Sequence, residues 1–195
     1  MRIQKKLIES ARREFIKKGY NQASLRSICS GAGVTTGALY FFFTDKDDLF
    51  HESVREPLEE LYSVVGAYFK TAAGVKEWSV DSADDVEAAM SIVRVLFKRR
   101  DLFLMLLTRS QGSKRENIKD EFVSFVEDHY VRFAKQFQRI SGKSFKGDKV
   151  IHWIAHNLVD VFVYLLEHCR TEKEAAERIP SIVSCLTAGW YALYE

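Results

Sequence analysis

The sequence predicts an all-α protein in which a small N-terminal domain precedes a larger helical domain. Its 195 residues are 47% hydrophobic, which is enough to bury a sizeable core. Apolar and charged residues interleave at helical spacing along almost the whole chain, without strand-like alternation or internal repeats. Only 10 Gly and 2 Pro interrupt it, as is typical of a largely helical globular protein. We expect the two domains to comprise residues 1–50 and 51–195.

Three helices are expected in the N-terminal domain. The first is marked by apolar residues at every fourth position, Ile3, Leu7, Ala11 and Phe15, and Gly19 ends it. Ser24 stands where an N-cap belongs, so a second short helix should run to about Ala32. The third, over about residues 35–41, is too tightly bounded to exceed one or two turns.

The rest of the chain should be helical as well. Thr44 or Asp45 caps the next helix, which Pro57 is expected to bend. Ser82 with Asp85 and Ser113 with Glu116 are expected to open two later helices. A loop containing Gly and Lys is expected at residues 141–147. The expected helices cover about residues 45–69, 82–99, 101–110, 113–140, 148–169 and 171–194.

Charge is distributed unevenly along the chain. Residues 1–50 contain nine Lys or Arg and five Asp or Glu, a net charge of +4, and the remaining residues carry −2. This asymmetry suits a module that meets a polyanion. No apolar run is long enough to span a bilayer, and the charged start lacks a signal-peptide apolar region. We therefore expect a cytoplasmic protein without a membrane partner, whose cysteines, Cys29, Cys169 and Cys185, form no disulfide.

Two short helices joined by a Gly-containing turn, placed after an amphipathic helix, are the helix-turn-helix arrangement that inserts its second helix into the major groove of DNA. The second helix here is the one expected at residues 35–41. Thr35 and Thr36 offer hydroxyls, Gly37 allows close backbone approach, and Ala38 suits contact with a thymine methyl. The partner predicted for this domain is double-stranded DNA.

The same segment resembles the TetR family of transcriptional regulators from about Lys6 to Val54. The matching stretches, which follow the family pattern without a gap, are Gly19-Tyr20, Ser24-Leu25-Arg26-Ser27-Ile28-Cys29, Ala32-Gly33-Val34-Thr35-Thr36-Gly37-Ala38-Leu39-Tyr40, and Phe43, Lys46 and Leu49 at fixed spacing. Phe42 departs from the family, which commonly has His or another polar aromatic residue there, and Cys29 replaces the usual Ala.

The resemblance implies roles for seven residues at a DNA interface. Thr35, Thr36 and Gly37 would meet the groove, and Tyr40 and Lys46 would each contact a phosphate. Ser24 and Arg26 match positions that often contact the backbone or bases. The resemblance further implies a ligand-responsive regulator, expected to be a repressor that acts as a homodimer on a palindromic operator.

The second domain is implied to bind an unknown small-molecule effector and to dimerise. Candidate effector-binding residues are aromatic or polar groups within apolar runs: Phe97, Arg109, Phe122, Phe125, His129, His156 and Asn157. Candidate interface residues are the apolar positions of the last two helices: Trp153, Leu158, Val161, Phe162, Leu165, Ile182, Leu186 and Trp190. Burial in an intramolecular core is the alternative for this second set.

Other classes of function find little support in the sequence. His152, His156 and Asp160 share a helical face at spacing four, but no zinc-protease motif or cysteine pair accompanies them, so we expect no metal and no cofactor. No phosphate-binding glycine loop, nucleophile elbow or acid pair indicates an enzyme. The alternative is a helical adaptor that binds protein partners without sequence-specific DNA binding.

Overall fold

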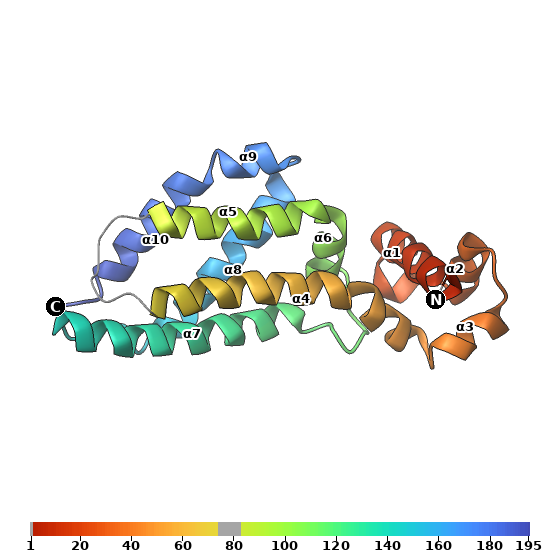
Figure 1. Cartoon of the computed structure of the whole chain (residues 1–195), viewed down its shortest axis with the longest axis horizontal. Helices are drawn as coiled ribbons and strands as arrows, with labels where there is room; N and C mark the ends of the chain where they lie inside the picture. Colours follow the sequence, from red (N-terminus) through yellow and green to blue (C-terminus); the bar gives the residue numbers. More distant parts are fainter. Residues whose placement is uncertain (1, 74–82) are drawn as a thin grey trace. The chain divides into compact units, whose positions relative to one another are not determined.

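The computed structural model describes residues 2–73 and 83–195, and Figure 1 shows that these residues form helices joined by short loops. Within this described part the only strand-like pairing is an isolated antiparallel bridge between Phe145 and Tyr194. The all-α prediction is confirmed. The helices are α1 Arg2–Gln22, α2 Leu25–Ala32, α3 Thr36–Phe42, α4 Lys46–Ala73, α5 Ala83–Lys98, α6 Arg100–Thr108, α7 Ile118–Ser141, α8 Ile151–His168, α9 Glu172–Ala176 and α10 Ile179–Tyr191.

The helices belong to two compact units. The N-terminal unit comprises Met1–Glu59 and Arg99–Ile118, and the C-terminal unit comprises Glu60–Lys98 and Lys119–Glu195. The N-terminal unit thus includes α6 and its flanks, although the sequence places that segment in the second domain. Packing of α6 against α1 explains the difference, because periodicity predicts a helix but not the helix it packs against.

The core of the N-terminal unit is built on aromatic side chains. Phe15 and Phe50 are fully buried, with ring centroids 4.9 Å apart, and Tyr20 packs on Phe50 at 5.0 Å. Leu39 of α3 is also fully buried. Aromatic pairs of this kind stabilise a core beyond their buried area. They fix the inner face of the three N-terminal helices and leave the outer face of α3 in solvent.

Helix ends in this unit follow the local sequence. The Ser24 side chain accepts a hydrogen bond from the Ser27 amide, and Gly33 ends α2 with φ 69°. Thr35 caps α3 from outside the helix, so α3 begins at Thr36. Asp45, rather than Thr44, caps α4 by accepting from the Asp48 amide at 2.7 Å. The predicted three-helix order is confirmed, and α4 continues through Pro57.

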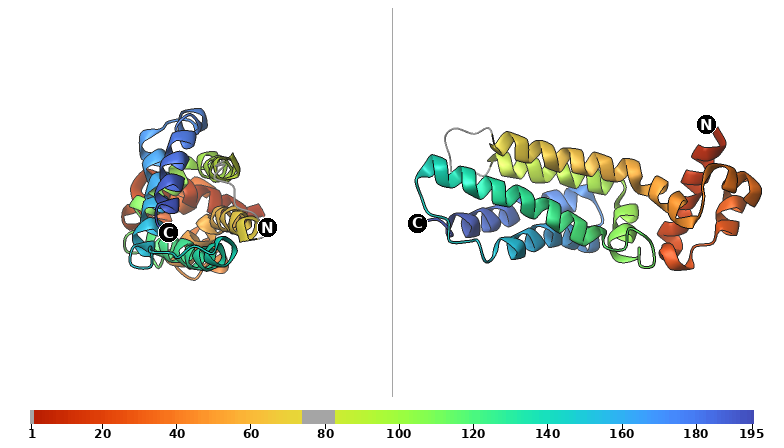
Figure 2. Two further views of the ribbon diagram at one scale, coloured as in Figure 1. Left: turned by 90° about the vertical axis from the view of Figure 1, so that its left-hand side faces the viewer. Right: turned by 90° about the horizontal axis from the view of Figure 1, so that it is seen from below.

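The C-terminal unit contains two groups of packed helices. Side chains of α4 and α7 stack along one another, with Tyr62 4.5 Å from Phe122 and Phe69 4.5 Å from His129, and the ribbons run together in Figures 1 and 2. Helix α5 packs on α8, α9 and α10 around buried residues that include Val93 and Leu165. No helix in the described part of the chain is long and apolar enough to cross a membrane.

Two expected helices differ from the observed ones. The helix expected from residue 113 begins at Ile118, because Ser113 donates its hydroxyl to the Ser110 carbonyl at 2.6 Å and stabilises a turn instead. The helix expected over residues 171–194 is divided into α9 and α10, and Pro180 lies in the first turn of α10. Ser82, the expected start of α5, lies outside the described residues.

Candidate DNA interface

The outer face of α3 is exposed. Thr36, Gly37 and Tyr40 all lie on the surface, and the Tyr40 side chain is 58% exposed. On the opposite face, Leu39 is completely buried. Three of the residues predicted to meet DNA are therefore brought together on one side of a short helix that its own core holds in place.

Thr35 and Gly37 shape the start of this face. The Thr35 hydroxyl oxygen accepts a hydrogen bond from the Ala38 amide at 3.2 Å, so this side chain caps α3, and its own O–H is left to donate elsewhere. A Cβ built on Gly37 would meet nothing closer than the Thr35 hydroxyl oxygen at 3.9 Å. Internal packing does not require glycine at residue 37, whereas an approaching nucleic acid backbone would benefit from it.

The α2 candidates have different surroundings. Ser24 is half-buried, and its hydroxyl oxygen caps α2, while Arg26 is exposed. Within the described part of the chain, no hydrogen bond or ion pair engages the Arg26 guanidinium. Arg26 is thus the α2 side chain that is available to an external anion.

Lys46 makes contacts within the protein. Its Nζ donates to the Asn21 carbonyl at 3.2 Å and lies 4.4 Å from the centroid of the Tyr20 ring. Burial lowers the pKa of Lys46, and the neighbouring Asp47 opposes that effect. Burial and Asp47 raise the pKa of Tyr20 to about 12. An ammonium has three donors, so the predicted phosphate contact of Lys46 stays a prediction beside this structural role.

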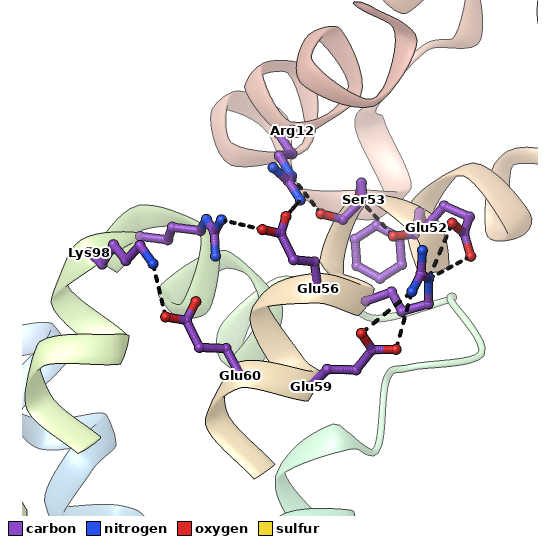
Figure 3. Close-up of polar contacts among 10 residues, drawn as sticks. Arg12, Glu52, Ser53, Glu56, Glu59, Glu60 and Lys98 are labelled. Carbon is purple, nitrogen blue, oxygen red and sulfur yellow. Dashed lines mark hydrogen bonds and ion pairs between the residues drawn. The ribbon is translucent and has the colours of Figure 1, made fainter. Parts of the chain in front are cut away.

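Two arginines that sequence patterns do not identify as structural make polar contacts between distant segments of the N-terminal unit. Arg12 donates from Nε to the Ser53 carbonyl at 2.7 Å and pairs with Glu56 at 3.3 Å (Figure 3). Arg109 donates from Nη2 to the Ile16 carbonyl at 2.8 Å. This contact gives the Arg109 guanidinium a partner in the backbone of α1, and its predicted effector role stays a prediction.

The structure gathers some of the other effector candidates. Phe125 and His129 are neighbours on α7, with ring centroids 4.5 Å apart, and with Phe122 they contact Tyr62 or Phe69 of α4. Phe97 belongs elsewhere in the same unit, against the buried cluster that α5 forms with α8, α9 and α10. His156 and Asn157 are half-buried on α8. Tyr62 and Phe69 are aromatic residues of the same apolar runs, and the structure places them against these candidates.

Some predicted interface residues lie in the core of the chain. Leu165 is fully buried, and Trp190 is 8% exposed among Tyr130, Phe133 and Phe145. Their burial within the chain favours the intramolecular-core alternative for these two residues, and an interface role for them stays a prediction. Val161, Phe162 and Ile182 also pack partly against the α5 cluster, while Leu158 and Leu186 are half-buried.

Other apolar side chains of α8 are exposed. Trp153 is 65% exposed, Tyr164 of the same helix is 46% exposed, and Val150, which directly precedes the helix, is 38% exposed. Of these only Trp153 was predicted. When a helix is apolar on two faces, its sequence does not show which face turns inward. Tertiary packing decides this.

The histidine group of α8 is paired with other residues. His152 Nδ1 lies 2.7 Å from a Glu127 oxygen, and Asp160 forms an ion pair with Lys119. The His152 and His156 rings meet edge to face, with centroids 4.7 Å apart. Among residues 2–73 and 83–195, no group of three or more His, Cys, Asp or Glu side chains is placed to hold a metal ion.

Comparisons with known proteins agree with the geometry of the N-terminal helices. The family model for bacterial regulatory proteins of the tetR family matches residues 7–53. The transcriptional repressor BepR of Brucella suis is 41% identical over 58 residues, which cover 28% of this chain and 28% of that protein. The chain thus matches little more than a quarter of the length of this curated relative.

Solved structures extend the likeness in fold to nearly the whole chain. A TetR-family transcriptional regulator from Syntrophomonas wolfei superposes with a TM-score of 0.66 at 18% identity, over 96% of this chain and 95% of that one. NalD, described as the secondary repressor of the MexAB-OprM multidrug efflux pump in Pseudomonas aeruginosa, gives a TM-score of 0.59 at 19% identity, over 93% and 94%. The N-terminal helices thus match the tetR family model in sequence, and the chain shares the fold of these solved structures.

Proposed function

We propose that the protein is a transcriptional regulator that binds double-stranded DNA through the outer face of α3 and acts as a repressor. The observation that carries the proposal is the exposed group formed by Thr36, Gly37 and Tyr40. It lies on the second of two short helices within the segment that matches the family model. Helix-turn-helix proteins insert this element into the major groove. Repression is the activity named for the relative BepR.

Selection of bound sequences from random duplex DNA tests the proposal. We expect an enriched inverted repeat, and binding to it should weaken steeply as salt is raised, because phosphate contacts release counterions. An adaptor that binds only proteins would enrich no sequence and would show no such salt dependence. That result, obtained with the folded protein, would favour the adaptor and overturn the DNA-binding proposal.

A homodimer accompanies the proposed activity. An inverted repeat has two-fold symmetry, which a two-fold dimer of helix-turn-helix units matches. The exposed apolar residues Val150, Trp153 and Tyr164 at α8 support this helix as part of the interface. The palindromic operator itself is part of the proposal and would emerge from the same selection.

Response to a small molecule is the remaining part of the proposed function. The aromatic side chains shared by α4 and α7, Tyr62, Phe69, Phe122, Phe125 and His129, form the group in the C-terminal unit that suits an apolar effector. The effector would lower operator affinity by favouring a conformation whose recognition helices are wrongly spaced. A cytoplasmic location, where bacterial DNA lies, follows from the proposed activity.

A further inference from the structure

Helix α1 is interrupted shortly before its end. Gly19 has φ 72° and ψ 173°, which are not helical values. In a continuous helix the amide of residue 20 donates to the carbonyl of residue 16. The interruption therefore leaves the Tyr20 amide and the Ile16 carbonyl in need of other partners, since unpaired backbone groups destabilise a fold.

Arg109 supplies both partners. The Tyr20 amide donates to the Arg109 carbonyl at 2.9 Å, and Arg109 Nη2 donates to the Ile16 carbonyl at 2.8 Å. One residue of another segment thus bridges the two backbone groups on either side of the break. The bridge requires close approach, because a Cβ on Gly19 would lie 3.2 Å from both the Cβ and the carbonyl oxygen of Arg109.

The bridged break is the start of the turn that leads into the helix-turn-helix. Tyr20 is buried, and its carbonyl accepts from the Ala23 amide at 3.2 Å. The next amide, that of Ser24, donates to Glu14 of α1 at 3.3 Å, and Ser24 then caps α2. The direction in which α2 leaves α1, and with it the position of α3, depends on how this turn is held.

The segment that carries Arg109 is itself fastened to the N-terminal unit at other points. The Lys114 amide donates to Asp47 at 3.0 Å, and Arg115 Nη2 lies 3.1 Å from His51 Nδ1. Both partners belong to the first turns of α4, which follow α3 in the chain. These contacts hold the segment in place and thereby fix the position from which Arg109 contacts α1.

We propose that Arg109 is a positioning residue for the DNA-binding surface: it joins α1 across the Gly19 break and thereby fixes the turn that orients α2 and α3. This inference rests on the proposed DNA-binding function for its consequence, but the bridge itself is independent of DNA. Arg109 acts through Tyr20 and Ile16 and makes no phosphate contact.

The test compares Arg109→Ala and Arg109→Lys with the control Arg94→Ala, which removes an exposed arginine of α5 that pairs with Glu87. In Arg109→Ala, the amides of Tyr20 and of the following turn should exchange with solvent about tenfold faster, as expected for the loss of one charge-assisted hydrogen bond. Arg109→Lys should restore part of the protection, because an ammonium donates to the same carbonyl. Arg94→Ala should leave exchange in the turn unchanged.

Measurements of DNA binding distinguish a positioning role of Arg109 from a direct contact between Arg109 and a phosphate. Affinity for the selected duplex should fall severalfold in Arg109→Ala, with the dependence of log affinity on log salt unchanged. Loss of a phosphate contact would instead reduce that slope by about one. A reduced slope, or unchanged exchange and affinity, would overturn the proposal. If the wild-type protein selects no DNA sequence, the proposed function fails, and the exchange experiment still decides whether Arg109 bridges the break.

A second variant distinguishes loss of the Arg109 bridge from a general loss of folding. Gly19→Ala keeps Arg109 but introduces a Cβ at positive φ, 3.2 Å from the Arg109 carbonyl. It should produce the same fast exchange at Tyr20 and the same unchanged salt slope, while circular dichroism retains the helical signal. Slow, wild-type exchange in Gly19→Ala would contradict the bridge.

Discussion

Arginine side chains supply missing backbone hydrogen-bond donors at two places in the N-terminal unit, the Gly19 break of α1 and Pro57 of α4. The ring nitrogen of Pro57 has no hydrogen, so the Ser53 carbonyl lacks the donor that residue 57 would normally provide in α4. Arg12 Nε donates to that carbonyl at 2.7 Å, a contact drawn as a dashed line in Figure 3. Guanidinium groups suit this task because they present several donors in a fixed plane. The contact makes the stability of α4 depend on α1.

Replacing Arg12 should reveal this dependence. We expect Arg12→Ala to lower the free energy of unfolding by about 1–2 kcal/mol, because it leaves the Ser53 carbonyl without its donor. The cost should be smaller in a Pro57→Ala background, where residue 57 regains its N–H. Urea unfolding of the four proteins in this double-mutant cycle measures the difference. Equal costs in both backgrounds would mean that Arg12 does not substitute for the missing helix bond.

Glu56 makes the stability of the same region depend on pH. Hydrogen bonding from Arg12, together with the charge of Arg99, holds the Glu56 pKa below its ordinary value of 4.5. A lowered folded-state pKa adds stability above pH 4.5, and this stability is lost as the pH falls through the folded-state value. The carboxylate side chain is 63% exposed, so solvent screening keeps the effect small.

The variant Glu56→Gln tests this assignment. It should be less stable than the wild type at pH 7, and the difference should shrink at pH 3, below the ordinary pKa of 4.5, where the carboxyl of the unfolded wild type is protonated. Chemical unfolding at the two pH values provides the measurement, and Glu9→Gln, at an exposed position of α1, serves as the control. A difference of the same size at both pH values would exclude the ionic contribution.

At the scale of single elements, α3 has a buried residue that packs in the core and an exposed face that is proposed to contact DNA. Leu39 is buried, and the Thr35 cap fixes the first turn. Such features were predictable, because capping and turn signals involve residues only three or four positions apart. The late start of α7 and the division between α9 and α10 were not, since Ser113 is as suitable for a turn as for a cap.

The Tyr40 hydroxyl should matter to DNA binding and to little else. The Tyr40 side chain is 58% exposed, so Tyr40→Phe should leave stability within about 0.5 kcal/mol of the wild type. Operator affinity should fall for all sequences alike, because a phosphate contact carries no base information. Titration of selected and unrelated duplexes measures this, with Arg94→Ala on α5 as the control. Unchanged affinity for both duplexes would remove the phosphate role.

At the scale of the whole molecule, the sequence predicted the helices better than their grouping. Residues 99–118 belong to the N-terminal unit, and Leu165 and Trp190 belong to the core of the C-terminal unit. Each of these facts depends on contacts between distant parts of the chain. Apolar spacing shows that a helix has a face to bury, but the partner helix decides whether that face meets the chain itself or a second copy.

Two single variants on α8 distinguish a residue that is buried within the chain from one that meets a second copy. Leu165→Ala should lower the free energy of unfolding by about 2–5 kcal/mol, because it removes a fully buried side chain. Trp153→Ala, at a position that is 65% exposed, should leave the fold intact and weaken self-association. Sedimentation of both variants over a range of concentrations provides the comparison. Self-association unaffected by Trp153→Ala would exclude this face from the interface.

The central claim is that the outer face of α3 contacts the bases of an operator. The most direct measurement is sequence selection from random duplex DNA, performed in parallel with the wild-type protein and with Thr36→Val, which removes one exposed hydroxyl from that face. The account predicts that both proteins enrich an inverted repeat and that base preference changes at the same position of each half-site. Identical enriched sequences, or no enrichment by the wild type, would contradict it.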